Sequence, residues 1–197
     1  MRVGLRRLER DGIDGLSMSD VAAEAESSIG ALYFRFGDKD QFVGAILAHA
    51  LGETRDKMAA LLDAAETENW PIDRIIEAWV GTLIDVVRKR RALLRIVIRQ
   101  ALARPEAIGP IRSVVIEVRE RLIAVLGGHK QFRDTPDWQQ RLRVAAQIVH
   151  GVLITMIIGQ PKPLGLNDDA AKEQLALAVL RYLDVAATRD PRPARRR

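Results

Sequence analysis

The polar side chains with the most informative spacing lie in residues 17–42, SMSDVAAEAESSIGALYFRFGDKDQF. Ser17 and Ser28 each precede a short amphipathic segment, where a serine hydroxyl can cap the start of a helix. Asp20, three residues after Ser17, completes a pair that resembles a capping box. Only residues 25–28 separate the two segments, so the two helices must cross steeply, as in a helix-turn-helix. Such a unit presents the N-terminal part of its second helix to the major groove of DNA.

Catalysis and metal binding find little support in the residue types. The chain has no cysteine, which excludes disulfides, zinc–thiolate sites and thiol chemistry. His49, His129 and His150 are too far apart in the sequence to suggest a metal site. No glycine-rich phosphate loop and no nucleophile elbow is found. We therefore expect no metal, no cofactor and no enzymatic activity, and keep an enzyme assembled from distant residues as the last alternative.

The composition is that of an ordinary globular protein, with 197 residues, 48% hydrophobic and 29% charged. Its net charge of +5 comes mainly from residues 189–197, RDPRPARRR, in which five arginines and one aspartate contribute +4. Residues 1–50 carry six basic and eight acidic side chains, a net charge of −2. Net charge therefore does not by itself favour nucleic-acid binding. No N-terminal apolar segment of the signal-peptide type is present, which predicts a cytoplasmic location.

The spacing of apolar residues is helical almost throughout and predicts an all-α fold. A first helix is expected from about Arg2 to Arg10, with Gly12 as its C-terminal stop. A helix-turn-helix follows, whose buried side chains are expected to be Leu32 and Phe36 in the second helix. After a short turn at residues 37–38, whose aspartate can serve as an N-cap, we expect a long helix over residues 39–65.

The spacing of apolar residues also predicts helices in the remaining two thirds of the chain. Helices are expected over residues 72–90, 91–104, 111–126, 139–159 and 168–187, with loops at 67–71 and 128–136. The stretch 144–159 is strongly apolar but contains Gln147 and His150. It is shorter than the ~20 apolar residues of a membrane span, so we interpret it as a buried or interface helix. The tail after residue 188 lacks apolar periodicity and is expected to be disordered.

With these residues in view, the N-terminal region resembles the tetracycline-repressor (TetR/AcrR) family of transcription regulators. The matching features are Val21-Ala22, the capping Ser28, the run Gly30-Ala31-Leu32-Tyr33, then Phe36 and Lys39. The resemblance covers about residues 5–45. It implies a DNA-binding domain over 1–47, a ligand-binding and dimerisation domain over 48–188, and a basic tail over 189–197. The family usually has glycine where Glu26 stands, and a positive φ there would cost glutamate about 1 kcal/mol.

The resemblance also implies which side chains touch DNA. Tyr33 and Lys39 would contact phosphates, Lys39 with help from the amides at its helix N-terminus. Ser17 could reach a phosphate in addition to capping. Arg35 could bind a phosphate or a guanine. The candidate DNA-binding residues are Ser17, Ser28, Ile29, Gly30, Ala31, Tyr33, Phe34, Arg35 and Lys39.

Some of these candidates have a second interpretation. Gly30 and Ala31 could let the helix approach base edges closely, with Ala31 against a thymine methyl, or could simply ease packing between helices. Ile29 and Phe34 could also make apolar contacts to thymine, but Phe34 could instead belong to the core. Lys39 could be an ordinary solvated lysine, and Tyr33 could pack between helices.

In the C-terminal part, apolar side chains at helical spacing are candidates either for plain core or for the small-molecule cavity that the family usually has. His150 could orient a polar group of a ligand, or could be a core or interface histidine. The candidate ligand-binding residues are Trp79, Leu83, Val86, Ile98, Leu102, Val118, Leu122, His150 and Met156. The family dimerises through its last two helices. The residues that we expect at that interface are Gly151, Ile154, Ile158, Leu175, Val179 and Tyr182.

Together these features predict a ligand-responsive transcriptional repressor. It would bind a near-palindromic, double-stranded DNA operator as a homodimer and respond to a small, apolar effector, without a membrane partner. An alternative from another class is a helical sensor or scaffold that keeps the fold without binding DNA.

Overall fold

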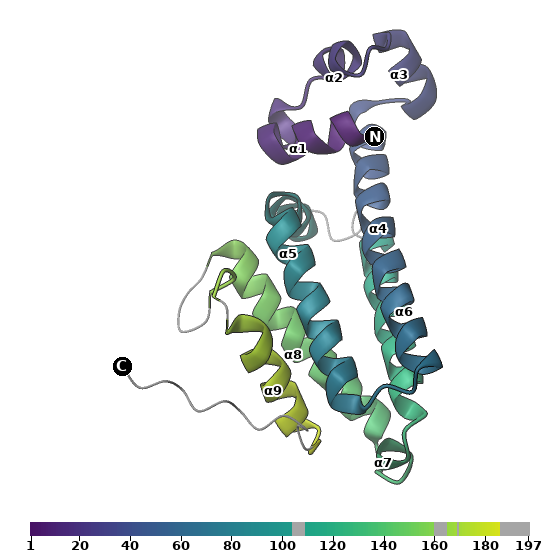
Figure 1. Ribbon diagram of the computed structural model, residues 1–197. Helices are drawn as coiled ribbons and strands as arrows, with labels where there is room; N and C mark the ends of the chain where they lie inside the picture. The colour runs from purple at the N-terminus through teal and green to yellow at the C-terminus, as the bar shows by residue number, and fades with distance from the viewer. Residues whose placement is uncertain (104–108, 160–164, 169, 186–197) are drawn as a thin grey trace. The chain divides into compact units, whose positions relative to one another are not determined.

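A computed structural model describes residues 1–103, 109–159, 165–168 and 170–185, and every regular element among them is a helix (Figure 1). The all-α prediction is therefore confirmed. The helices are α1 (Arg2–Gly15), α2 (Met18–Glu24), α3 (Ile29–Phe36), α4 (Lys39–Thr67), α5 (Ile72–Ala103), α6 (Gly109–Gly127), α7 (Lys130–Arg133), α8 (Trp138–Ile158) and α9 (Ala171–Tyr182).

The helices group into two compact units. Unit 1 comprises residues 1–59 and 86–118, and unit 2 comprises residues 60–85 and those from 119 onward. Helices α4, α5 and α6 each contribute one part to each unit. The division into functional domains at residues 47 and 48 stays a prediction, and the tail over 189–197 lies outside the described residues.

The predicted N-caps are present at the starts of α2, α3 and α4. Ser17 Oγ accepts a hydrogen bond from the Asp20 amide at 3.3 Å, and Ser28 Oγ accepts one from the Ala31 amide at 3.1 Å. Asp38 caps α4, with Oδ1 2.7 Å from the Gln41 amide. These local predictions are confirmed.

Two glycines with positive φ mark the ends of segments in the same region. Gly12 has φ 71°, and α1 is broken there but resumes and runs to Gly15, past the predicted stop. Gly37 has φ 80° and ends α3. A side chain disfavours this backbone region, so glycine fits both positions.

One hydrophobic core joins the helix-turn-helix to α1, α4 and the last part of α5. Leu32 is buried in it, as predicted, and Phe36 is half-buried with its ring centroid 4.9 Å from that of Phe42. The buried members are Leu8, Leu16, Met18, Val21, Ala22, Leu32, Phe42, Val43, Ile46, Ala50, Leu93 and Ile96.

Three predicted boundaries differ from the structure. The two helices expected to meet between residues 90 and 91 are one helix, α5, with a break at Arg90 (φ −118°, ψ 25°). The predicted loop 128–136 contains the short helix α7. Helix α9 begins at Ala171 rather than at 168 and ends at Tyr182, whereas the predicted end at residue 187 lies outside the described residues.

Unit 2 is held together by ion pairs between helices as well as by its apolar core. Arg143 of α8 pairs with Glu120 of α6 at 3.1 Å, and Lys172 of α9 pairs with Asp85 of α5 at 2.6 Å. Helix α8 is the one described helix that is long and apolar enough to cross a membrane. An 18-residue window of this helix has a mean hydropathy of 1.5, and 39% of the window is buried. One such helix is weak evidence for a membrane, because the core helix of a folded domain has the same character.

Candidate nucleic-acid interface

Helix α3 divides sharply into a buried side and an open side. Leu32 is 9% exposed, whereas Phe34 is 95%, Tyr33 46% and Ile29 45% exposed. A large aromatic ring that stays in water does not stabilise the fold, and exposed apolar groups of this kind mark contact surfaces. The alternative that places Phe34 in the core is wrong.

Gly30 and Ala31 lie on the exposed surface at the start of α3. A Cβ built on Gly30 would have as its nearest neighbour Ser28 Oγ, at 3.9 Å, which is ordinary contact. The chain's own packing therefore does not require glycine here. This finding speaks against packing between helices as the reason for glycine at this position, and the close approach to base edges stays a prediction.

The turn before α3 contains the unfavourable backbone conformation that the sequence suggested. Glu26 has φ 51°, in the left-handed region that favours glycine. The turn is closed by the amide of Ser27, which donates to the carbonyl of Ala22 at 2.9 Å. Glutamate thus follows the same path that glycine would take, at a cost of about 1 kcal/mol.

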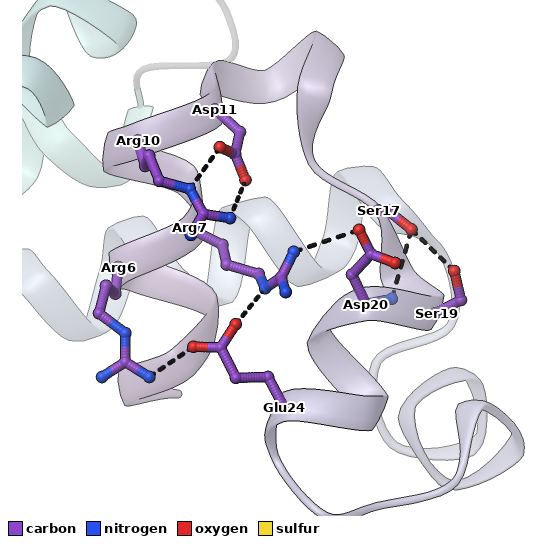
Figure 2. Close-up of polar contacts among 8 residues, drawn as sticks. All are labelled: Arg6, Arg7, Arg10, Asp11, Ser17, Ser19, Asp20 and Glu24. Carbon is purple, nitrogen blue, oxygen red and sulfur yellow. Dashed lines mark hydrogen bonds and ion pairs between the residues drawn. The ribbon is translucent and has the colours of Figure 1, made fainter.

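Three acidic residues of this region, Asp11, Asp20 and Glu24, pair with arginines of α1, as Figure 2 shows. Glu24 accepts from Arg6 at 2.6 Å and from Arg7 at 2.5 Å, and Arg7 also reaches Asp20 at 3.2 Å. Hydrogen bonds from Arg6 and Arg7 lower the pKa of Glu24. Asp20 therefore bonds Arg7 rather than closing the capping box with its side chain.

These pairs change how the net charge of the region should be interpreted. Asp20 and Glu24 of α2 pair with arginines of α1, and α3 itself contains no acidic residue. Arg35 has no ion pair with any described residue, and its guanidinium lies 5.2 Å from the Phe36 ring centroid. The exposed face of α3 is therefore apolar with one cation, although residues 1–50 as a whole are net negative. The sequence could not reveal the pairing, because the partners are 13 to 18 positions apart.

Lys39 lies at the start of α4, where a phosphate contact was predicted. Its Nζ donates to the Asp14 carbonyl at 3.4 Å and forms no ion pair with a described residue. The N-terminus of α4 is already occupied by the carboxylate of Asp38. Asp38 Oδ1 accepts from the Gln41 amide, and the expected help from this helix N-terminus to a phosphate contact at Lys39 stays a prediction.

Ser17 is half-buried, and its hydroxyl also lies 2.8 Å from Ser19 Oγ. Its capping role is clear, and its reach to a phosphate stays a prediction.

The predicted ligand-binding residues differ in their exposure. Trp79, Leu122 and Met156 are buried in unit 2, and the Trp79 ring meets His150 edge to face, with centroids 6.4 Å apart. Leu102 is 82% exposed and is therefore not a core residue, contrary to the prediction. The other members, Leu83, Val86, Ile98 and Val118, are half-buried.

The predicted interface residues separate into two groups. On α8, Ile154 is 46% and Ile158 48% exposed, and Gly151 is exposed with open space around its Cβ position. Tyr182 of α9 is 38% exposed. Leu175 and Val179, also on α9, are 4% and 1% exposed in the chain itself. These two pack inside unit 2, so their assignment to an interface is wrong.

Comparisons with known proteins agree with this geometry. Residues 1–46 match the family model described as bacterial regulatory proteins, tetR family. The N-terminal domain of this chain, residues 1–46, is thus a domain of the tetR type. No curated protein matches it.

Solved structures extend the similarity in fold over nearly the whole chain. A TetR transcription regulator from Haloarcula marismortui has a TM-score of 0.70 at 19% identity and covers 93% of each chain. A transcriptional regulator from Rhodococcus sp. has a TM-score of 0.66 at 23% identity, covering 93% of this chain and 91% of that one. The multidrug binding protein EbrR, complexed with imidazole, has a TM-score of 0.60 at 23% identity, covering 96% and 95%.

Proposed function

We propose that this protein is a transcriptional repressor of the tetR family that binds a near-palindromic DNA operator as a homodimer and releases it when a small effector binds. It would act in the cytoplasm, where the DNA is. The observation that carries the proposal is the open face of α3, where Ile29, Tyr33 and Phe34 are exposed beside Arg35. An unpartnered apolar face with one cation and no acid suits the major groove of DNA.

In this proposal some residues of α3 and Lys39 of α4 position the protein on the DNA backbone, and other residues of α3 contact the bases. The Tyr33 hydroxyl and the Lys39 ammonium bind phosphates and set the register on the duplex. Gly30 lets the helix backbone come close to the bases, and Phe34 packs on thymine methyl groups. Ile29 and Ala31 would add apolar contacts of the same kind, and Arg35 would bind a phosphate or a guanine.

The homodimer would form through the exposed stripe of α8. Ile148, Gly151, Ile154 and Ile158 follow one another at helical spacing on this face. The stripe is apolar, and the glycine permits close approach of a second helix. A twofold dimer would carry two α3 helices, which explains why the operator should be nearly palindromic.

The response to an effector requires that the effector bind one of two conformations more tightly than the other. Couplings of this kind are typically worth about 1–3 kcal/mol, or roughly 5- to 150-fold in DNA affinity. The similarity in fold to a multidrug binding protein is compatible with a small apolar effector.

The test is selection of duplexes from a random library by the full chain, followed by affinity measurements on the enriched site. We expect an inverted repeat. Lys39→Ala should weaken binding about tenfold or more and reduce the salt dependence by about 1.8 in slope, because a dimer loses two phosphate contacts. Lys57→Ala, on the same helix and exposed, is the matched control and should bind normally. Failure to enrich any duplex would refute DNA binding and favour the sensor alternative.

The dimer is tested separately by its mass in solution. Ile154→Glu places a charge in the centre of the stripe and should yield a folded monomer with much weaker DNA binding. Gln139→Glu, exposed near the other end of α8, should stay dimeric. A dimeric Ile154→Glu variant would refute the α8 interface.

A further inference from the structure

Trp79 has a buried hydrogen-bond donor for which the described chain supplies no acceptor. Its side chain is 1% exposed, and its Nε1 has no partner among the described residues. Buried donors are almost always paired in native proteins, so an unpaired one points to a missing group. Trp70 shows the usual situation, because its Nε1 donates to Glu68 Oε2 at 2.7 Å.

The ring of a second polar side chain lies against the Trp79 ring. His150 of α8 meets the Trp79 ring edge to face, with an interplanar angle of 84°. Burial lowers the pKa of His150, and the charge of Arg119 lowers it further, whereas a hydrogen bond to the backbone of Ala146 opposes both. The ring is therefore neutral at neutral pH. Because one ring nitrogen donates to the backbone, the other must be an acceptor.

The residues that neighbour this pair along both helices are aliphatic. Ile75, Ile76 and Val80 are buried on α5, and Leu153 and Met156 are buried on α8. The donor of Trp79 and the acceptor of His150 thus lie on helix segments with several buried apolar side chains. A molecule that satisfied both would have one small polar group on an apolar body.

We propose that Trp79 and His150 bind the hydroxyl group of an uncharged effector, a phenol or a similar alcohol. The hydroxyl oxygen accepts from the Trp79 Nε1–H, and the hydroxyl proton is donated to the ring nitrogen of His150. This inference rests on the proposed response to an effector and names its chemistry. A carboxylate would fit less well, because it has no proton to donate to the neutral ring.

The test uses the full chain, with phenol and toluene as probes of nearly equal size. The chain has three tryptophans and so gives three indole N–H resonances in a nitrogen–proton correlation spectrum, and Trp79→Phe identifies one of them. We expect phenol to shift the Trp79 resonance downfield and to saturate. Phenol should bind about five- to tenfold tighter than toluene, the usual gain from a buried hydrogen bond.

Variants then separate the hydrogen bonds from packing. Trp79→Phe should lose the preference for phenol while still binding toluene, and Trp70→Phe, whose indole is already paired, should keep it. His150→Leu removes the acceptor from a half-buried position and should also lower the preference, which keeps the test informative if Trp79→Phe does not fold.

Three results would overturn the assignment. They are equal affinity for phenol and toluene, a Trp79 resonance that phenol does not move, and a full phenol preference in Trp79→Phe. A Trp79 resonance already in the hydrogen-bonded range and insensitive to phenol would mean that a buried water satisfies the indole. Binding of phenol at Trp79 without any change in affinity for the selected duplex would leave this site standing and refute the effector response instead.

Discussion

Replacing Gly4 by alanine should destabilise unit 1, because α1 comes unusually close to α4 at this residue. A Cβ on Gly4 would lie 2.6 Å from Phe42 Cζ and 2.9 Å from Ile46 Cδ1. Carbon atoms normally pack about 3.5–4.0 Å apart, so the overlap is about 1 Å. Phe42 is 1% and Ile46 0% exposed, and neither ring nor methyl group can swing into water.

The size of the effect follows from two opposing contributions. Overpacking a filled core costs about 1–3 kcal/mol. Alanine in place of glycine favours a helix by at most about 1 kcal/mol, and less in the first turn, where Gly4 lies. Gly44→Ala is the matched control, since it is exposed on α4 with nothing within 4 Å of its Cβ position. The two variants should differ by about 1–3 kcal/mol, with Gly4→Ala the less stable.

The assay is thermal unfolding followed by circular dichroism. In a chain of this length 1 kcal/mol corresponds to about 2–4 °C, so the melting temperatures should differ by about 2–12 °C. Equal melting temperatures for the two variants would refute the close approach of α1 to α4. The same contact has a functional consequence, because Phe42 follows Lys39 by one helical turn and its packing fixes the start of α4.

Three further predictions follow from other parts of the chain. Gly30→Ala should leave the melting temperature within about 2 °C of wild type, because the added Cβ meets no close neighbour. The same variant should bind the selected duplex about tenfold more weakly. Normal affinity would contradict the close approach of α3 to the bases. Glu26→Gly should stabilise the chain by up to about 1 kcal/mol because of its positive φ, whereas Ser27→Gly, outside that region, should destabilise it. Finally, the pKa of His150 is lowered in the folded chain, so on acidification the histidine is protonated at a higher pH in the unfolded chain than in the folded one. The stability of the fold should therefore fall as the pH drops below about 6.5. In His150→Gln the melting temperature should fall less over the same pH range.

Interactions within a few residues could be predicted well from the sequence. The caps by Ser17, Ser28 and Asp38 depend only on the three residues that follow each of them. The positive φ at Glu26 was expected from the family resemblance, because the family usually has glycine at this position. The family resemblance rests on the same compact segment, and the matched residues 1–46 cover it.

Contacts between distant residues could not be predicted in this way. Periodicity showed that α9 has an apolar face, but not whether Leu175 and Val179 pack on their own chain or on a partner. The sequence predicted a boundary between two helices at residues 90–91, whereas the structure has one helix, α5, with a break at Arg90.

The amino-acid sequence by itself determined the helix-turn-helix, since helix starts, turn length and the apolar spacing of short helices are set by neighbouring residues. The tertiary structure alone decided which side chains are left open or unpaired. Phe34 is exposed on α3, whereas Leu32 of the same helix is buried in the core. The charge of Glu24 is balanced by Arg6, which lies on another helix, α1. The Trp79 indole is buried, and its Nε1 has no hydrogen-bond partner among the described residues. Burial and pairing depend on what packs from elsewhere in the chain, and no local pattern records that.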